Sequence, residues 1–121
     1  MSQPTRIEAL LPLKPVELEV LLALVDTERH GYGIVQHIAE RTDGLVRLEP
    51  GNLYRVIKRL LDEGLVQESH RRAPPDDPAE RRRYYRLTAH GARVIAAELH
   101  RLRAVVSSSP ARTLLRRLDP A

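Results

Sequence analysis

The stretch that decides the fold runs from residue 50 to residue 87 and reads PGNLYRVIKRLLDEGLVQESHRRAPPDDPAERRRYYRL. Its first part predicts a helix, because apolar side chains recur at the i, i+3, i+4, i+7 and i+8 positions: Leu53, Val56, Ile57, Leu60 and Leu61. The opposite face and its flank carry polar groups: Asn52, Tyr54, Arg55, Lys58, Arg59 and Asp62. Asn and Arg side chains pair with base edges, and Lys or Tyr contacts phosphates. The pattern predicts either a helix that reads a DNA major groove or an ordinary solvated helix.

The residues after Gly64 favour the first alternative. Two short β-prone runs, 65 to 70 and 83 to 87, flank a segment in which three prolines prevent regular structure. Along the second run, alternation places Tyr85 on the buried side with Leu87 and leaves Tyr84 exposed. The hairpin contains six arginines and no lysine: Arg71, Arg72, Arg81, Arg82, Arg83 and Arg86. Guanidinium groups suit phosphates and the minor groove, so we expect the first five to grip DNA as a wing.

The residues before this stretch predict two supporting helices. Pro15 fits a first helical position, and Leu18, Leu21, Leu22 and Val25 follow at helical spacing. After His30 and Gly31, a second helix is expected from Tyr32 to Thr42; it would pair with the Leu53 helix as a helix-turn-helix. Tyr32, at its N-terminus, could contact a phosphate or pack against the wing. We also expect residues 45 to 48 to add a third strand to the hairpin.

The segment after Leu87 predicts a dimerisation helix. Thr88 is a good N-cap residue, and the apolar residues beyond it fall at intervals of three and four: Ala92, Ile95, Leu99, Leu102 and Val106. Such a seam indicates a homodimer with Leu18 and Leu21 sharing the interface, although a helix packed on its own domain has the same pattern. Residues 107 to 110 interrupt the helix. The amphipathic segment 111 to 118 then either caps the dimer or forms a basic tail.

The motifs together resemble those of the PadR-like transcriptional regulators. The matching residues are His30-Gly31-Tyr32-Gly33-Ile34, Leu53-Tyr54, Leu60, Glu63-Gly64-Leu65-Val66, Arg83-Tyr84-Tyr85-Arg86-Leu87-Thr88 and Gly91, within the range from residue 16 to residue 106. The resemblance implies a winged helix-turn-helix fold and a homodimeric DNA-binding repressor. It also implies, in some members, release from DNA by a small-molecule effector.

The amino-acid composition is consistent with a winged helix-turn-helix protein that binds DNA. The 121 residues suffice for one domain and an arm, and the core must be mainly aliphatic because only 3% of residues are aromatic. The formal net charge of +4 is consistent with a polyanionic partner. The absence of cysteine excludes disulfides and thiolate chemistry. We find no signal peptide or membrane-spanning run, and expect a cytoplasmic protein.

Catalytic motifs are missing from the sequence. The five histidines show no metal-binding spacing, and neither a nucleophile elbow nor a phosphate-binding glycine loop is present. We therefore expect neither an enzyme nor a bound metal or cofactor. The competing hypothesis is a winged helix that binds only protein, which would favour an apolar or mixed wing; an RNA-binding role would favour exposed stacking aromatics.

The sequence thus predicts a mainly α fold with a small β-hairpin (α+β), a winged helix-turn-helix. Residues 1–14 would form an N-terminal arm, 15–88 the DNA-binding domain, and 89–121 the dimerisation helix and tail. The predicted function is regulation of transcription at an inverted-repeat operator, because two reading helices related by a two-fold axis enter successive major grooves.

Overall fold

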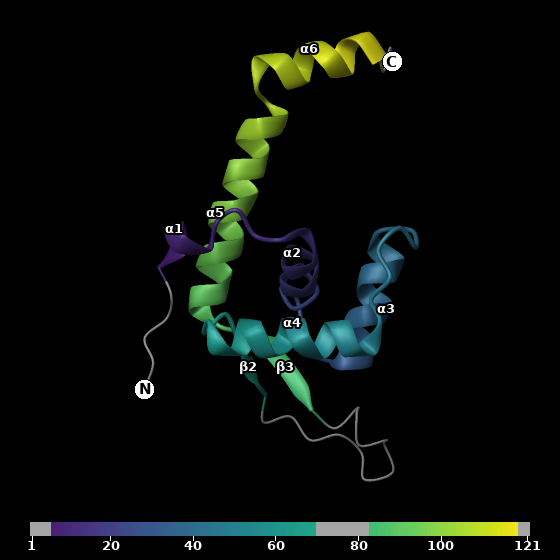
Figure 1. The fold of residues 1–121 in the computed structure, drawn as a ribbon, viewed down its shortest axis with the longest axis vertical. Helices are drawn as coiled ribbons and strands as arrows, with labels where there is room; N and C mark the ends of the chain where they lie inside the picture. Colours follow the sequence, from purple (N-terminus) through teal and green to yellow (C-terminus); the bar gives the residue numbers. More distant parts are fainter. Residues whose placement is uncertain (1–5, 70–82, 119–121) are drawn as a thin grey trace.

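The computed structural model describes residues 6–69 and 83–118 (Figure 1). The helices are α1 (Ile7–Leu10), α2 (Pro15–Leu22), α3 (Gly31–Arg41), α4 (Pro50–Asp62), α5 (Ala89–Val106) and α6 (Ser109–Leu118). The strands are β1 (Arg29–His30), β2 (Val66–Glu68) and β3 (Tyr84–Leu87). The mainly helical fold with a small antiparallel sheet is the one that the sequence predicts. Figure 1 shows α2 above the middle of α4, α3 at one end of α4 and α5 rising from the other end, with strands β2 and β3 below α4.

The sheet contains a strand that the sequence analysis placed wrongly. Its order is β1-β3-β2, and both pairs are antiparallel. The third strand is Arg29–His30, which pairs with Tyr84 and Tyr85, and not the expected segment 45 to 48. That segment is held by the end of α3 instead: the Val46 N–H donates to Thr42 Oγ1 at 3.0 Å. Its backbone is therefore turned towards the helix end and not along the sheet.

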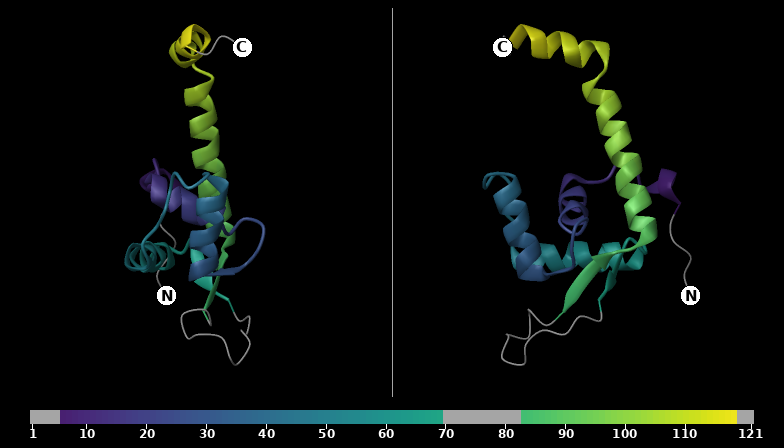
Figure 2. Two further views of the ribbon diagram at one scale, coloured as in Figure 1. Left: turned by 90° about the vertical axis from the view of Figure 1, so that its right-hand side faces the viewer. Right: turned by 180° about the vertical axis from the view of Figure 1, so that it is seen from behind.

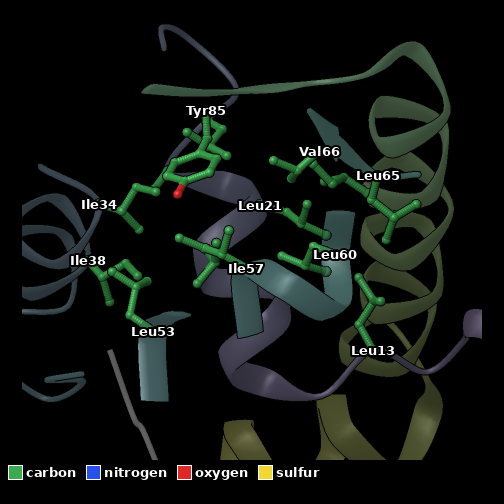
Figure 3. Close-up of a cluster of buried hydrophobic side chains, with 14 of the residues drawn as sticks. Leu13, Leu21, Ile34, Ile38, Leu53, Ile57, Leu60, Leu65, Val66 and Tyr85 are labelled. Atoms are coloured by element: carbon green, nitrogen blue, oxygen red, sulfur yellow. The ribbon is translucent and has the colours of Figure 1, made fainter. Parts of the chain in front are cut away.

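The core forms where α2, α3 and α4 meet the sheet. Ile34, Leu53 and Ile57 are almost completely buried there, and Figure 3 shows Ile34 beside Tyr85 of β3 and Leu21 beside Ile57 and Leu60. Tyr85 joins this cluster with 4% of its surface exposed, as the strand alternation predicts. Burial raises the pKa of its phenol above the ordinary value of 10.0. The core is otherwise aliphatic, as the composition requires.

One tight junction connects the end of α4 to the start of α5. Gly64 ends α4 with φ at +76°, a left-handed conformation that favours glycine. Thr88 caps α5: its Oγ1 accepts from the Gly91 N–H at 2.9 Å and donates to the Gly64 carbonyl at 2.7 Å. A Cβ on Gly91 would lie 2.1 Å from the Leu65 carbonyl oxygen, so only glycine allows α5 to approach this closely.

The C-terminal helices extend away from the domain. The first half of α5 packs on the core, whereas its second half and α6 project beyond it in every view (Figure 2). The N-terminal segment returns to α5, because α1 contacts this helix and Leu13 is buried against it. Within the described ranges, every helix is too short or too polar to cross a lipid bilayer.

Candidate nucleic-acid interface

Helix α4 has one buried, apolar face and one exposed, polar face. Pro50 starts the helix at a position where no backbone N–H is required. Leu53, Ile57 and Leu60 are at most 2% exposed. The polar residues that the sequence analysis selected on this helix are all exposed: Asn52, Tyr54, Arg55, Lys58 and Arg59. The structure therefore collects five hydrogen-bonding side chains along one accessible helix surface.

Two of these side chains form a pair. The Arg55 Nη2 donates to the Asn52 Oδ1 at 3.0 Å, one helical turn apart. Arginine has only donors, so the amide oxygen must face it and the amide N–H₂ must face outward. The pair therefore presents mainly donors to a ligand, because Arg55 already uses one of the two lone pairs of the amide oxygen.

Arg59 is held by a neighbouring helix. Its Nε lies 3.3 Å from Glu17 Oε2 of α2, and Glu17 is only 7% exposed. The other carboxylate oxygen of Glu17 accepts from the Lys14 N–H at 2.9 Å. The sequence analysis assigned Arg59 to DNA and missed Glu17. A glutamate at the third helical position, three residues after the N-cap Lys14, is the capping signal that could have indicated it.

The start of α3 lies beside the wing. His30 caps the helix, because its Nδ1 accepts from the Gly33 N–H at 2.9 Å. Its ring stacks on Tyr32 with centroids 6.4 Å apart and meets the edge of Tyr84 in β3 at 5.4 Å. Tyr32 is nevertheless 49% exposed, so it both touches the aromatic cluster at the wing and faces solvent.

The described part of the wing ends in a basic residue. Arg83 is exposed just before β3, and its Nε lies 3.9 Å from Glu68 of β2. This separation between exposed groups is a weak interaction, and although Arg83 also hydrogen-bonds Tyr85, its side chain is 73% exposed. Arg71, Arg72, Arg81 and Arg82, the other wing arginines predicted to bind DNA, lie outside the described residues.

The predicted dimerisation residues divide into two groups. Leu21 and Ile95 are 0% and 3% exposed within the chain's own core, so neither side chain has surface to offer a partner. Their helical spacing is the same for an internal contact as for an external one, which explains the error. Leu18 and Leu102 are partly buried, and Ala92, Leu99 and Val106 are exposed. Leu99 and Val106 expose 44% and 59% of their surface on α5.

A shallow groove of about 490 Å³ lies between the start of α2 and the polar face of α4. Its lining includes Lys14 and Glu17 from α2 and its N-cap, and Asn52, Arg55 and Arg59 from α4. The groove therefore shares side chains with the exposed donor surface. Within residues 6–69 and 83–118, no group of three or more His, Cys, Asp or Glu side chains is arranged to hold a metal ion.

The comparisons with known proteins agree with this geometry. The profile of the "Transcriptional regulator PadR-like family" matches residues 20–97. Among curated proteins, no sequence matches the chain at a significant level. A PadR family transcription regulator from Clostridium difficile is 19% identical over 86% of this chain and 97% of its own, with a TM-score of 0.65.

Two other solved structures have the same fold. RosR of H. salinarum is 23% identical over 90% of this chain and 92% of its own, with a TM-score of 0.63. Bacillus subtilis PadR, solved in complex with operator DNA, is 22% identical over 73% of this chain and 48% of its own, with a TM-score of 0.61. At these sequence identities, the similarity to the solved structures shows a shared fold.

Proposed function

Because the chain belongs to the PadR-like family of transcriptional regulators, we propose that it binds double-stranded DNA sequence-specifically through α4 and the wing. Members of this family are regulators and not enzymes. The observation that carries the proposal is the exposed row of Asn52, Tyr54, Arg55 and Lys58 on one face of α4. An α-helix fits the major groove of B-form DNA, and these are the side chains that contact bases and phosphates there.

The pairing of Asn52 with Arg55 suggests which base edge is read. A donor-only pair suits guanine, which presents the N7 and O6 acceptors in the major groove. Adenine presents an acceptor and a donor, so it would have to share the amide oxygen that already accepts from Arg55. We therefore assign guanine recognition to the pair, in place of the adenine contact expected for asparagine alone.

The neighbouring groups would position the helix on the duplex. Tyr32 lies at the N-terminus of α3, where backbone N–H groups attract phosphates, and Arg83 lies at the base of the wing. Further phosphate contacts would come from the wing arginines predicted to bind DNA: Arg71, Arg72, Arg81 and Arg82. Such contacts release counterions, so affinity would fall steeply with salt concentration.

A homodimer would give the DNA site its symmetry. Leu99 and Val106 are exposed, Leu102 is partly buried, and their spacing of three and four residues continues one stripe along the second half of α5. Two copies joined along this stripe would place their α4 helices about 34–36 Å apart, one helical turn of DNA. The expected operator is an inverted repeat, and occupying it would repress transcription sterically. A small-molecule effector would release the DNA.

Selection from a random duplex library tests this proposal. The wild-type protein should enrich an inverted repeat that contains guanine in each half-site. Asn52→Ala should lose the preference at that position, because Arg55 loses the partner that orients it, while the half-site spacing is retained. Enrichment of no sequence would contradict specific recognition and favour a winged helix that binds protein. Enrichment of adenine at the affected position would contradict the guanine assignment alone.

A further inference from the structure

Helix α6 leaves an apolar face uncovered at the end of the molecule. Figure 1 shows α6 running across the far end of α5, away from the rest of the chain. Its apolar residues recur at helical spacing and therefore share one side of the helix: Ala111, Leu114, Leu115 and Leu118. The three leucines expose 55%, 53% and 74% of their surface. The chain's own core therefore does not account for this face.

The other side of α6 is cationic. Arg112, Arg116 and Arg117 are exposed there, and within the described residues none of them has an acidic partner. At about 100° per residue, the apolar side chains cover an arc of about 100°, and each arginine lies at least about 60° outside it. The two kinds of side chain are thus cleanly separated around the helix.

The positive charge extends into α5. Between residues 89 and 118 the sequence contains six arginines and a single acidic residue, Glu98. Glu98 is 1% exposed and already accepts a hydrogen bond from Arg101. Asp119, the next residue in the sequence, lies outside the described residues. The exposed surface of residues 89–118 therefore combines leucines with arginines and offers no carboxylate.

This charge discriminates between the surfaces that could cover the leucines. A second α6 would bring three more arginines towards the first three, and like charges repel. Duplex DNA would neutralise the arginines but leave the leucines in water. An anionic lipid surface complements both faces, because the leucines enter the boundary of the hydrocarbon while the guanidinium groups meet the lipid phosphates.

We propose that α6 lies on the surface of an anionic lipid bilayer and attaches the protein to it. A helix with separate apolar and cationic faces lies along a membrane, and the ten residues of α6 are too few to cross one. In Figure 1, α6 lies at the end of the molecule opposite β2 and β3. The lipid surface and the proposed DNA surface therefore use different residues, and the lipid contact does not depend on the proposed function.

Vesicle binding by the full chain tests the proposal. Co-sedimentation is measured with phosphatidylcholine vesicles that contain about one third phosphatidylglycerol, and with vesicles of phosphatidylcholine alone. The anionic vesicles should bind at least about tenfold more tightly, and this binding should weaken as salt screens the charges. Equal binding to both kinds of vesicle, or no binding to the anionic kind, would overturn the proposal.

A matched pair of variants locates the contact. Leu115 and Val25 are 53% and 52% exposed, and Val25 lies between α2 and β1, outside α6. Leu115→Gln should weaken binding to the anionic vesicles about tenfold, because it removes one of three inserted leucines. Val25→Gln should leave the binding unchanged. Wild-type vesicle binding in Leu115→Gln would place the lipid on another cationic surface and contradict the role of α6.

The arginines are tested by charge. Replacing Arg112, Arg116 and Arg117 together by glutamine should weaken vesicle binding about a hundredfold, since each cation near an anionic surface contributes about fivefold. Replacing the same three residues by lysine keeps the charge and should retain most of the binding. Equal losses in the two triple variants would indicate a site that requires the guanidinium group itself, and would contradict attraction to a lipid surface.

Two controls address the other occupants of the face. Leu115→Gln should leave self-association unchanged in sedimentation equilibrium. Weaker self-association, with no vesicle binding by the wild-type protein, would assign the leucines to a second copy. The glutamine triple variant should retain its affinity for a scrambled duplex. A loss of that affinity, again without vesicle binding, would assign the arginines to DNA. Either result would overturn the proposal.

Discussion

The backbone N–H of Leu13 donates to Oε2 of Glu98 at 2.8 Å, across 85 positions of the chain. Glu98 is 1% exposed in the middle of α5, and its other oxygen accepts from the Arg101 Nε at 2.5 Å. This buried carboxylate therefore ties the segment before α2 to the helix that carries the proposed dimer stripe. The hydrogen bond from Arg101 lowers the pKa of Glu98 below its ordinary value of 4.5, against the opposing effect of burial.

Glu98→Gln should destabilise the fold by about 2 kcal/mol at neutral pH, because a charge-assisted hydrogen bond and a buried ion-pair partner are lost. The folded-state pKa is lowered, so this stability is present above the carboxyl's unfolded pKa and is lost as pH falls through the folded one. Urea unfolding at several pH values should show the two proteins converging in acid. Glu8→Gln, an exposed change in α1, is the control; a difference that persists undiminished at low pH would contradict this role.

Gly91→Ala should destabilise the fold by about 3 kcal/mol, since its Cβ would lie 2.1 Å from the Leu65 carbonyl oxygen and α5 would have to move. Gly51→Ala, in contrast, should increase the stability of the fold. Gly51 lies in the first turn of α4 with nothing within 4 Å of its added Cβ, so alanine should stabilise by about 0.5–1 kcal/mol. Thermal or chemical unfolding measures both; equal effects of the two substitutions would refute the close approach at Gly91.

Arg55→Ala and Arg59→Ala should differ in DNA binding. Arg55 is proposed to contact a base, so its loss should remove about 1–3 kcal/mol of discrimination between the preferred duplex and one altered at a single base pair. Arg59 is engaged by Glu17 on the α2 side, so alanine there should weaken all duplexes to a similar, smaller extent. Titrations with the two duplexes make the comparison. Greater loss of discrimination in Arg59→Ala would show that the reading face lies nearer to α2.

Leu99→Glu should weaken self-association at least tenfold, because it places a charge in the proposed apolar stripe of α5. Leu99 exposes 44% of its surface in the single chain, so the fold itself should tolerate the change. Ala104→Glu is the matched control, since Ala104 is also exposed but lies about 140° around the helix from Leu99. Sedimentation equilibrium should give a dimer for the control. Equal association of both variants would place the interface elsewhere.

Local patterns were enough to predict α4, the Thr88 cap and the buried Tyr85. These features depend on residues close in sequence, whose spacing directly fixes which side chains share a face. Strand β1 was missed because two residues carry no alternation, and pairing with β3 alone makes Arg29–His30 a strand.

The buried Glu98 shows what the sequence alone could not predict. Charged residues are ordinarily exposed, so Glu98 gave no signal for burial. Its position depends on the backbone N–H of Leu13, which lies 85 positions away in the chain and is brought to it only by the fold. Leu21 and Ile95 were assigned to a dimer interface because a periodic apolar stripe shows that a helix face is buried. The stripe does not show whether the same chain or a second copy covers that face.

The central claim, specific DNA recognition through α4 and the wing, is tested most directly by fluorescence anisotropy. The full chain is titrated against a duplex from upstream of its own gene and against a scrambled duplex, at about 50 and 200 mM salt. The account predicts that the native duplex binds at least about 10³-fold more tightly and that both affinities fall steeply with salt. Equal affinity for the two duplexes, or no binding at the lower salt concentration, would contradict it.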